Sequence, residues 1–245
     1  MKIDQMFSYD EHSKCRMSDW MGGCPPRQYP ERKRGRRHGH PKKIKAESKL
    51  NVFFANVTSC SKEAMTYIVN NTNYHVNGIA ETHKRGDDLQ KIIEQCKTTG
   101  WKTIAAPAEQ SDRSPSGTFG GMLSLTSRGC KCAMPLEMDP TSHCVDSPNM
   151  IHHIIRLHGM SLVVIFVYLK DNVGIKGDNV AILNRIAAIK NSSGMQTLVM
   201  GDFNVSPTTL IESGYPELMD MTVIHEPFAD GTCRHSGKEH ISTID

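Results

Sequence analysis

The most informative segment of the chain is residues 197–204, which read TLVMGDFN. Its first four residues are apolar or β-branched and predict a short, buried strand. The tetrapeptide GDFN ends the segment, and Ser206-Pro207 then predicts a helix start, with serine as N-cap and proline at the first helical position. Because α/β proteins place their chemistry where strands end, Asp202 and Asn204 are candidate functional residues.

Strands and helices alternate in the part of the chain that precedes this segment. Apolar runs of strand length occur at residues 50–57, 75–81 and 101–106. Between them, residues 61–70 and 87–98 have the apolar spacing and the end signals of helices. This alternation is typical of an α/β protein.

Antiparallel strands are predicted in the middle of the chain. Strand-like runs cover residues 121–127, 151–157 and 162–169, and the last two flank a short turn at 158–161, which predicts a hairpin. A helix is predicted over residues 178–190. The order fits neither a purely parallel nor a purely antiparallel sheet. We therefore expect a four-layer α/β sandwich, with two mixed β-sheets packed face to face and helices outside.

The charge of the chain is unevenly distributed. Residues 1–48 contain 12 Lys/Arg against 6 Asp/Glu, whereas residues 49–245 contain 17 against 20. The first segment lacks apolar periodicity, so we expect a disordered basic N-terminal tail followed by one domain at 49–245. The basic run at 32–43 is either a nuclear-localisation or nucleic-acid-contacting arm, or a solvated leader without a role.

Composition limits the class of protein. The chain has 245 residues, 38% of them hydrophobic, which suffices for a substantial core. It has no apolar run long enough to cross a bilayer and no signal-peptide pattern at its start. Eight cysteines at irregular spacings do not form a disulfide framework. We therefore expect an intracellular protein, nuclear if the basic run is a localisation signal, with no membrane association.

Polar residues stand at the ends of several predicted strands. Asn56, Glu81 and Tyr168 end three of them, Asp202 follows the strand at 197–200, and Asp245 ends the sequence. Each has a structural alternative when taken alone. The asparagine can cap a turn, the glutamate can be a solvated strand end and the tyrosine can be half-buried core. The set as a whole is more informative than any one member.

In this order along the chain, these residues resemble the endonuclease/exonuclease/phosphatase superfamily, which includes apurinic-type DNA repair nucleases, DNase I-like enzymes, deadenylases and inositol phosphatases. The resemblance covers residues 50–245. GDFN at 201–204 is its most specific match, and Gly120-Gly121 matches a glycine pair that opens a middle strand. The sequence around Ser206-Pro207, with Ser213-Gly214, is similar to retroelement-type members.

The resemblance implies a role for each strand-end residue. Glu81 would bind a divalent metal, Mg²⁺ or in its place Mn²⁺, with Asn56 supporting the metal or contacting phosphate. Asp202 would position or deprotonate the attacking water, and Asn204 would hold that aspartate and the phosphate. Tyr168 would donate a hydrogen bond to a nonbridging phosphate oxygen.

Asp245 matches the aspartate that, in this superfamily, orients a histidine from a later Ser-Asp-His motif. The chain stops at Asp245, and neither Ser18-Asp19 nor Ser111-Asp112 is followed by a histidine. We therefore expect the last strands of the fold to be missing and the domain to be incomplete at its C-terminus. Hydrolysis by the 245-residue chain should then be severely impaired.

Three functions remain open at this point. The first is a metal-dependent endonuclease that acts on nucleic acid, on DNA rather than RNA, as a monomer. The second is an inactive, truncated remnant or nucleic-acid-binding module of a retroelement. The third is a phosphatase acting on a small phosphorylated molecule or a lipid head group.

Two further features lie near the candidate site or in the predicted core. His152 and His153 are adjacent in a predicted strand, so one should face inward and the other outward, and a core histidine is favoured over a metal ligand. Arg113 and Lys170 fall in predicted loops beside the site. They can contact substrate phosphates or be ordinary surface charges.

Overall fold

The computed structural model describes residues 49–57, 59–70, 73–111, 114, 117–133, 148–157, 159–224, 233–234 and 241–242. From Asn51 onward these residues belong to one compact unit. The basic tail at 1–48, Arg113 and Asp245 lie outside the described residues, and so do the predictions made for them. Among the described residues, no helix is long and apolar enough to cross a membrane.

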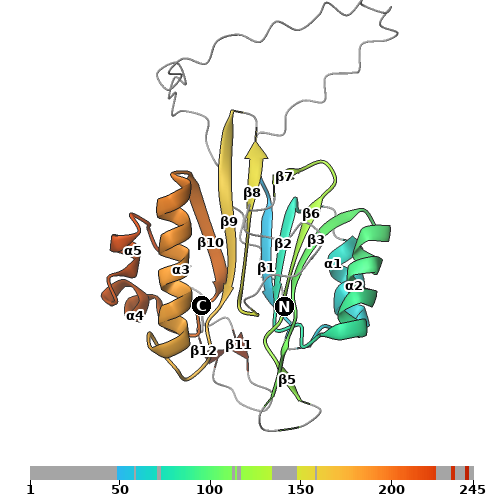
Figure 1. Ribbon diagram of the computed structural model, residues 1–245, viewed down its shortest axis with the longest axis horizontal. Coiled ribbons are helices and arrows are strands. Elements are labelled where there is room, and N and C mark those ends of the chain that lie inside the picture. Colours follow the sequence, from blue (N-terminus) through green and yellow to red (C-terminus); the bar gives the residue numbers. More distant parts are fainter. Residues whose placement is uncertain are drawn as a thin grey trace, which may run out of the picture. The chain divides into compact units, whose positions relative to one another are not determined.

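The first sheet has four strands in the spatial order β1-β2-β6-β3. They are β1 (Val52–Asn56), β2 (Val76–Ala80), β3 (Trp101–Ala106) and β6 (Met122–Ser127). β1 and β2 are parallel, whereas β6 runs antiparallel to β2 and β3. Helices α1 (Lys62–Asn70) and α2 (Gly86–Thr98) cover the outer face of this sheet (Figure 1), where they share one hydrophobic cluster with it.

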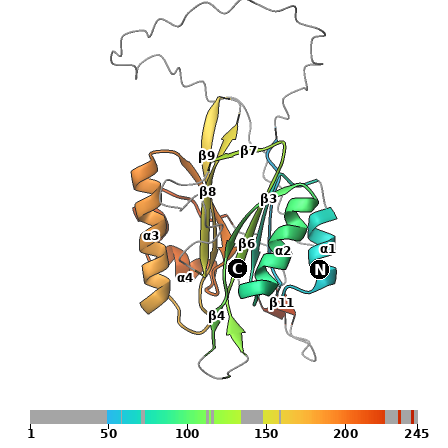
Figure 2. The ribbon, with the colours of Figure 1, turned by 45° about the vertical axis from the view of Figure 1, so that its right-hand side comes forward.

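The second sheet has the order β10-β9-β8-β7. Its strands are β7 (Lys131–Ala133), β8 (Met150–Leu157), β9 (Met160–Tyr168) and β10 (Gln196–Asp202). β8 and β9 form the predicted antiparallel hairpin, and β10 pairs with β9 in parallel. The outer face is covered by α3 (Gly177–Ser193), α4 (Pro207–Glu212) and α5 (Tyr215–Leu218), on the side away from α1 and α2 (Figure 1). Figure 2 shows α3 opposite α1 and α2 from a second direction.

The inner faces of the two sheets pack against each other through Phe166, which is fully buried. Its ring covers Gly78 of β2 so closely that a Cβ atom there would overlap the ring. The rings of Phe54 and His153 lie beside it, each with its centroid 6.0 Å away. This packing confirms the predicted architecture of two mixed sheets, face to face, with helices outside.

His153 is a core residue, as favoured from the sequence. It is fully buried on the inner face, and its Nδ1 lies 3.4 Å from Ser124 Oγ. Burial lowers its pKa to about 3, because the charged imidazolium would lose its hydration. The ring is therefore neutral at physiological pH.

The N-cap of α4 was predicted correctly from the sequence, whereas the length of the turn between β8 and β9 was not. The Ser206 hydroxyl accepts a hydrogen bond from Thr209 N at 3.1 Å, which confirms it as the N-cap of α4. The predicted turn at 158–161 is too long, because Met160 pairs with Leu157 inside the ladder. Two-residue connections suit the twist of antiparallel strands. The three-residue strand β7 was not predicted, since so short a run has no detectable period.

Candidate active site

The structure brings five predicted site residues to one end of the sandwich. Asn56 is the last residue of β1 and pairs with Ala80, so Glu81 follows directly beside it. In the second sheet, Asp202 at the end of β10 pairs with Tyr168 at the end of β9. Parallel pairing in each sheet therefore places two candidate residues at the same edge.

Two hydrogen bonds join the sheets at this edge. Asn56 Nδ2 donates to Asp202 Oδ2 at 2.8 Å, and the Tyr168 hydroxyl donates to Glu81 Oε1 at 2.7 Å. Each bond links a residue of the first sheet to a residue of the second. The candidate site is thus formed by the contact between sheets and not by either sheet alone.

The contacts of the GDFN tetrapeptide explain why these residue types occur at its positions. A Cβ atom on Gly201 would overlap the Val167 carbonyl oxygen, so only glycine allows β10 to lie this close to β9. Asp202 is 8% exposed, and its Oδ1 accepts from Asn204 N at 3.1 Å. Phe203 packs against the hydrophobic cluster of the second sheet. Both carboxylate oxygens of the aspartate therefore accept hydrogen bonds, which fixes its orientation.

Asn204 adopts a left-handed backbone conformation, with φ 47°. Asparagine tolerates this region better than most residues. Its side-chain Nδ2 donates to the Leu169 carbonyl at 2.6 Å, which links the turn after β10 to the residue after Tyr168. The amide is thereby held beside the aspartate it was predicted to support.

Glu81 also has a left-handed backbone, with φ 54°, which is strained for glutamate. The strain is maintained by the glycine pair: Thr82 N donates to Gly121 O at 3.0 Å, and His83 N donates to Gly120 O at 3.1 Å. Gly121 has φ 84°, and a Cβ atom there would approach Thr82 Oγ1 to 2.6 Å. Backbone strain held by its surroundings is characteristic of functional sites.

Tyr168 is kept protonated by its surroundings. Burial raises the pKa of the phenol, and the hydrogen bond to Glu81 raises it further. The negative charges of Glu81, Asp202 and Asp171 act in the same direction. The hydroxyl therefore remains a hydrogen-bond donor over the whole physiological pH range.

The side chains at this edge fit a hard divalent cation. Among the described residues there is no cluster of three or more His, Cys, Asp or Glu side chains that could hold a metal. The site offers the carboxylates of Glu81 and Asp202 and the side-chain amide of Asn56. Oxygen ligands in this number suit Mg²⁺, which retains several waters and needs only one or two protein carboxylates.

Lys170 lies at the rim of the site, two residues beyond Tyr168. Its ammonium forms an ion pair with Asp178 at 2.6 Å and lies 5.3 Å from the centroid of the Phe119 ring. Phe119 belongs to the small hairpin of β4 (Glu109–Gln110) and β5 (Thr118–Phe119). The cation therefore has partners within the protein, and its contact with a substrate phosphate stays a prediction.

One residue near the site was missed by the sequence analysis. Asn179, in the first turn of α3, is fully buried and forms hydrogen bonds to the loop that follows Tyr168. Its signal was present in the sequence, since it lies four residues before Leu183 on the apolar stripe of the helix. A polar residue on such a stripe requires partners.

One comparison with solved structures supports the fold. No protein-family model and no curated protein sequence matches the chain. Among solved structures, the endonuclease domain of TRAS1, a telomere-specific non-LTR retrotransposon, is 12% identical, with a TM-score of 0.54 over 79% of this chain and 81% of that domain.

Two other similar structures share less of the chain. A 3′-5′ exonuclease from Neisseria meningitidis is 14% identical, with a TM-score of 0.42 over 64% of this chain and 58% of its own. An AP endonuclease from Leishmania major is 9% identical, with a TM-score of 0.42 over 63% and 54%. The TRAS1 domain has the fold that the GDFN tetrapeptide and the strand-end residues predicted. The chain thus has a DNase I-like fold, which it shares with the TRAS1 endonuclease domain.

Proposed function

We propose that the chain is a divalent-metal-dependent phosphodiester hydrolase, an endonuclease that acts on DNA. The observation that carries the proposal is the pair of hydrogen bonds between the sheets, Asn56 to Asp202 and Tyr168 to Glu81. They bring the carboxylates of Asp202 and Glu81 and the hydroxyl of Tyr168 to one edge. We propose that these groups activate water, bind the metal and donate to phosphate. These are the groups that hydrolysis of a phosphodiester requires.

Glu81 and Asn56 are the proposed ligands of Mg²⁺, or of Mn²⁺ in its place. When bound, the cation neutralises phosphate oxygens and the charge that develops on the leaving group. The left-handed backbone of Glu81 fixes the direction in which its carboxylate points. One oxygen of this carboxylate accepts the Tyr168 hydroxyl, which further restricts its rotation.

Asp202 is the proposed proton acceptor. It is almost fully buried, and bonds from Asn56 Nδ2 and Asn204 N hold its two oxygens in place. An oriented carboxylate can align a water molecule for attack on phosphorus and accept its proton. Tyr168, held in its protonated form, turns its single O–H from Glu81 to a nonbridging phosphate oxygen when the substrate binds. Negative charge grows on that oxygen in the transition state.

DNA is the proposed substrate because of the similarity to the TRAS1 domain, an endonuclease of a telomere-specific retrotransposon. At 12% identity that similarity supports the fold directly and the substrate only as a proposal. We accordingly propose a retroelement-type endonuclease that works as a monomer. A small phosphoester is the alternative substrate that the experiment below separates from DNA.

The test is a single-turnover cleavage assay with the purified 245-residue chain in excess over end-labelled substrate. Duplex DNA, single-stranded RNA and p-nitrophenyl phosphate are compared, each with Mg²⁺, with Mn²⁺ and with EDTA. The variants Glu81→Gln and Asp202→Asn preserve the size of each side chain and remove its charge. Glu94→Gln and Asp88→Asn, both exposed on α2, are the matched controls.

We expect slow, metal-dependent cleavage of DNA that each site variant reduces by at least about 100-fold. The control variants should cleave at the rate of the unmodified chain. Cleavage that persists in EDTA, or that survives either site substitution, contradicts the proposal. Hydrolysis of p-nitrophenyl phosphate without cleavage of DNA would replace the nuclease by a phosphatase.

A further inference from the structure

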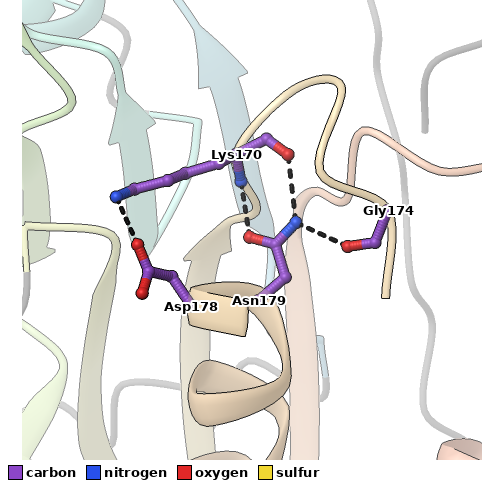
Figure 3. A network of polar contacts seen from close by, with 4 residues as sticks. All are labelled: Lys170, Gly174, Asp178 and Asn179. Carbon is purple, nitrogen blue, oxygen red and sulfur yellow. Dashed lines mark hydrogen bonds and ion pairs between the residues drawn. The ribbon is translucent and has the colours of Figure 1, made fainter. Parts of the chain in front are cut away.

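The loop that follows β9 is held by a single buried asparagine. Asn179 Oδ1 accepts from Lys170 N at 2.8 Å, while its Nδ2 donates to Lys170 O at 3.0 Å and to Gly174 O at 2.8 Å (Figure 3). The side chain therefore binds both backbone groups of Lys170 and closes the loop through Gly174. Its carboxamide oxygen and nitrogen are both satisfied.

The position of Asn179 on its helix would ordinarily be apolar. Ile182, Leu183 and Ile186 lie three, four and seven residues further on, and all are buried on the same face of α3. Asn179 is itself 0% exposed. Burying an amide is unfavourable unless it is hydrogen-bonded, so this residue serves the loop and not the hydrophobic packing of the helix.

Two asparagines hold the same peptide plane from opposite edges. The peptide between Leu169 and Lys170 is rigid, so its carbonyl and its N–H move together. The Leu169 carbonyl accepts from Asn204 Nδ2 at 2.6 Å, and the Lys170 N–H donates to Asn179 Oδ1. Rotation of this plane without Asn179 would therefore turn the Leu169 carbonyl away from Asn204.

Two other backbone groups of the Tyr168–Lys170 segment are bonded to β10 and to the residue before β8. Tyr168 N donates to Asn149 O at 2.9 Å, and Leu169 N donates to Asp202 O at 2.9 Å. Asp178 of α3 also contacts this segment, through an ion pair with Lys170, and its side chain is 70% exposed. An exposed ion pair contributes little to holding a backbone.

We propose that Asn179 is a positioning residue that sets the placement of Asn204 and Tyr168 by fixing the Leu169–Lys170 peptide. The inference rests on the function proposed above for those two side chains. Asn179 acts through the peptide plane, by its bond to the Lys170 N–H, and not through the reacting groups. Its loss should lower the rate of the chemical step and leave substrate affinity nearly unchanged.

The first test needs no catalysis. Amide hydrogen exchange is measured by NMR in the unmodified 245-residue chain, in Asn179→Leu and in Asn179→Asp. The leucine variant removes every hydrogen bond, whereas aspartate keeps the acceptor for Lys170 N and the original size. Leu183→Ala is the control, since it weakens the same buried stripe without touching the loop.

We expect the Lys170 amide to exchange at least tenfold faster in Asn179→Leu and to be partly protected in Asn179→Asp. Amides of β10 and of the middle of α3 should be unaffected. In Leu183→Ala, exchange should rise along α3 while Lys170 keeps its protection. Unchanged Lys170 exchange in Asn179→Leu, or equal acceleration in the control, overturns the inference. If the leucine variant does not fold, the aspartate variant decides, because it loses the bonds to the Lys170 and Gly174 carbonyls. Unchanged exchange of the Lys170 amide in Asn179→Asp then overturns the inference.

The second test is a double-mutant cycle on the single-turnover rate. Asn179→Leu should slow cleavage about tenfold or more in the unmodified chain, with a change in DNA dissociation constant below about twofold. In an Asn204→Ala background, the same substitution should have a much smaller effect, because the other edge of the peptide is already released. Equal effects in both backgrounds overturn the inference. Absence of cleavage throughout contradicts the proposed function instead, and the exchange result still decides the role of Asn179.

Discussion

Replacing Gly78 by alanine tests the packing that brings the two halves of the site together. Gly78 lies on the inner face of β2, directly beneath the Phe166 ring of β9. A Cβ atom there would overlap Cδ1 and Cγ of that ring and would lie 2.6 Å from Cε1. The ring, or the sheet that carries it, must therefore move by more than about 1 Å to restore an ordinary carbon contact of about 3.5–4.0 Å.

The expected loss of stability follows from how little room the ring has. Phe166 is fully buried, with Phe54 on one side and His153 on another, so it cannot rotate into free space. Overpacking a well-filled core costs about 1–3 kcal/mol, and this enclosed site belongs at the upper end. A loss of about 2–3 kcal/mol lowers the melting temperature of a domain of this size by about 4–12 °C.

Thermal unfolding followed by circular dichroism measures the change. Gly129→Ala is the matched control, because nothing lies within 4 Å of a Cβ atom at that exposed glycine. Its melting temperature should stay the same or rise slightly. Combining Gly78→Ala with Phe166→Leu should recover part of the loss, since the smaller side chain vacates the overlap. A Gly78→Ala melting temperature within about 1 °C of the unmodified chain would refute the described packing of the two sheets.

Three further predictions concern the site, the core and a helix end. Tyr168→Phe removes the hydroxyl that donates to Glu81. It should lower the single-turnover rate of DNA cleavage by a factor of about 10²–10³ in the assay described above. A rate within twofold of the unmodified chain would exclude the hydroxyl from catalysis. His153 has a folded-state pKa of about 3, below the ordinary value of about 6.5. Between these two pH values the unfolded state binds more protons than the folded state. The free energy of unfolding therefore falls as the pH is lowered through this window. Urea titrations from pH 6.5 to 4 should therefore show a slope up to about 1.4 kcal/mol per pH unit steeper than in His153→Gln, and equal slopes would contradict a neutral, buried ring. Ser206→Ala removes the N-cap of α4 and should cost about 0.5–2 kcal/mol of unfolding free energy, measured in urea, whereas an unchanged midpoint would mean that the cap contributes nothing.

Much of the fold is encoded in local patterns. The strand at Trp101–Ala106 and the helix caps Ser61 and Ser206 follow from apolar periodicity and from hydroxyl side chains at helix starts. The pairing order of the first sheet is not local. β6 lies between β2 and β3 and is antiparallel to both, and no pattern within any one of these strands specifies that pairing.

The candidate site was also predictable only in part from local sequence patterns. Asn56 and Asp202 stand out in the sequence because each ends a strand, but their hydrogen bond joins residues 146 positions apart. The left-handed backbone of Glu81 is invisible in the sequence, since glutamate does not favour it and the Gly120-Gly121 carbonyls impose it. Asn179 was missed because a buried amide on an apolar stripe reveals its purpose only when its partners are placed.

The most direct test of the central claim is the position of a bound divalent cation. Crystals of the 245-residue chain soaked in Mn²⁺ are measured at a wavelength where manganese scatters anomalously, and Glu81→Gln crystals are treated identically. We predict an anomalous peak about 2 Å from a Glu81 carboxylate oxygen and next to the Asn56 amide, absent from the variant. A saturating soak that leaves this edge of the sandwich without a peak, or an equal peak in Glu81→Gln, would contradict the assignment of Glu81 as the metal ligand of a phosphodiester hydrolase.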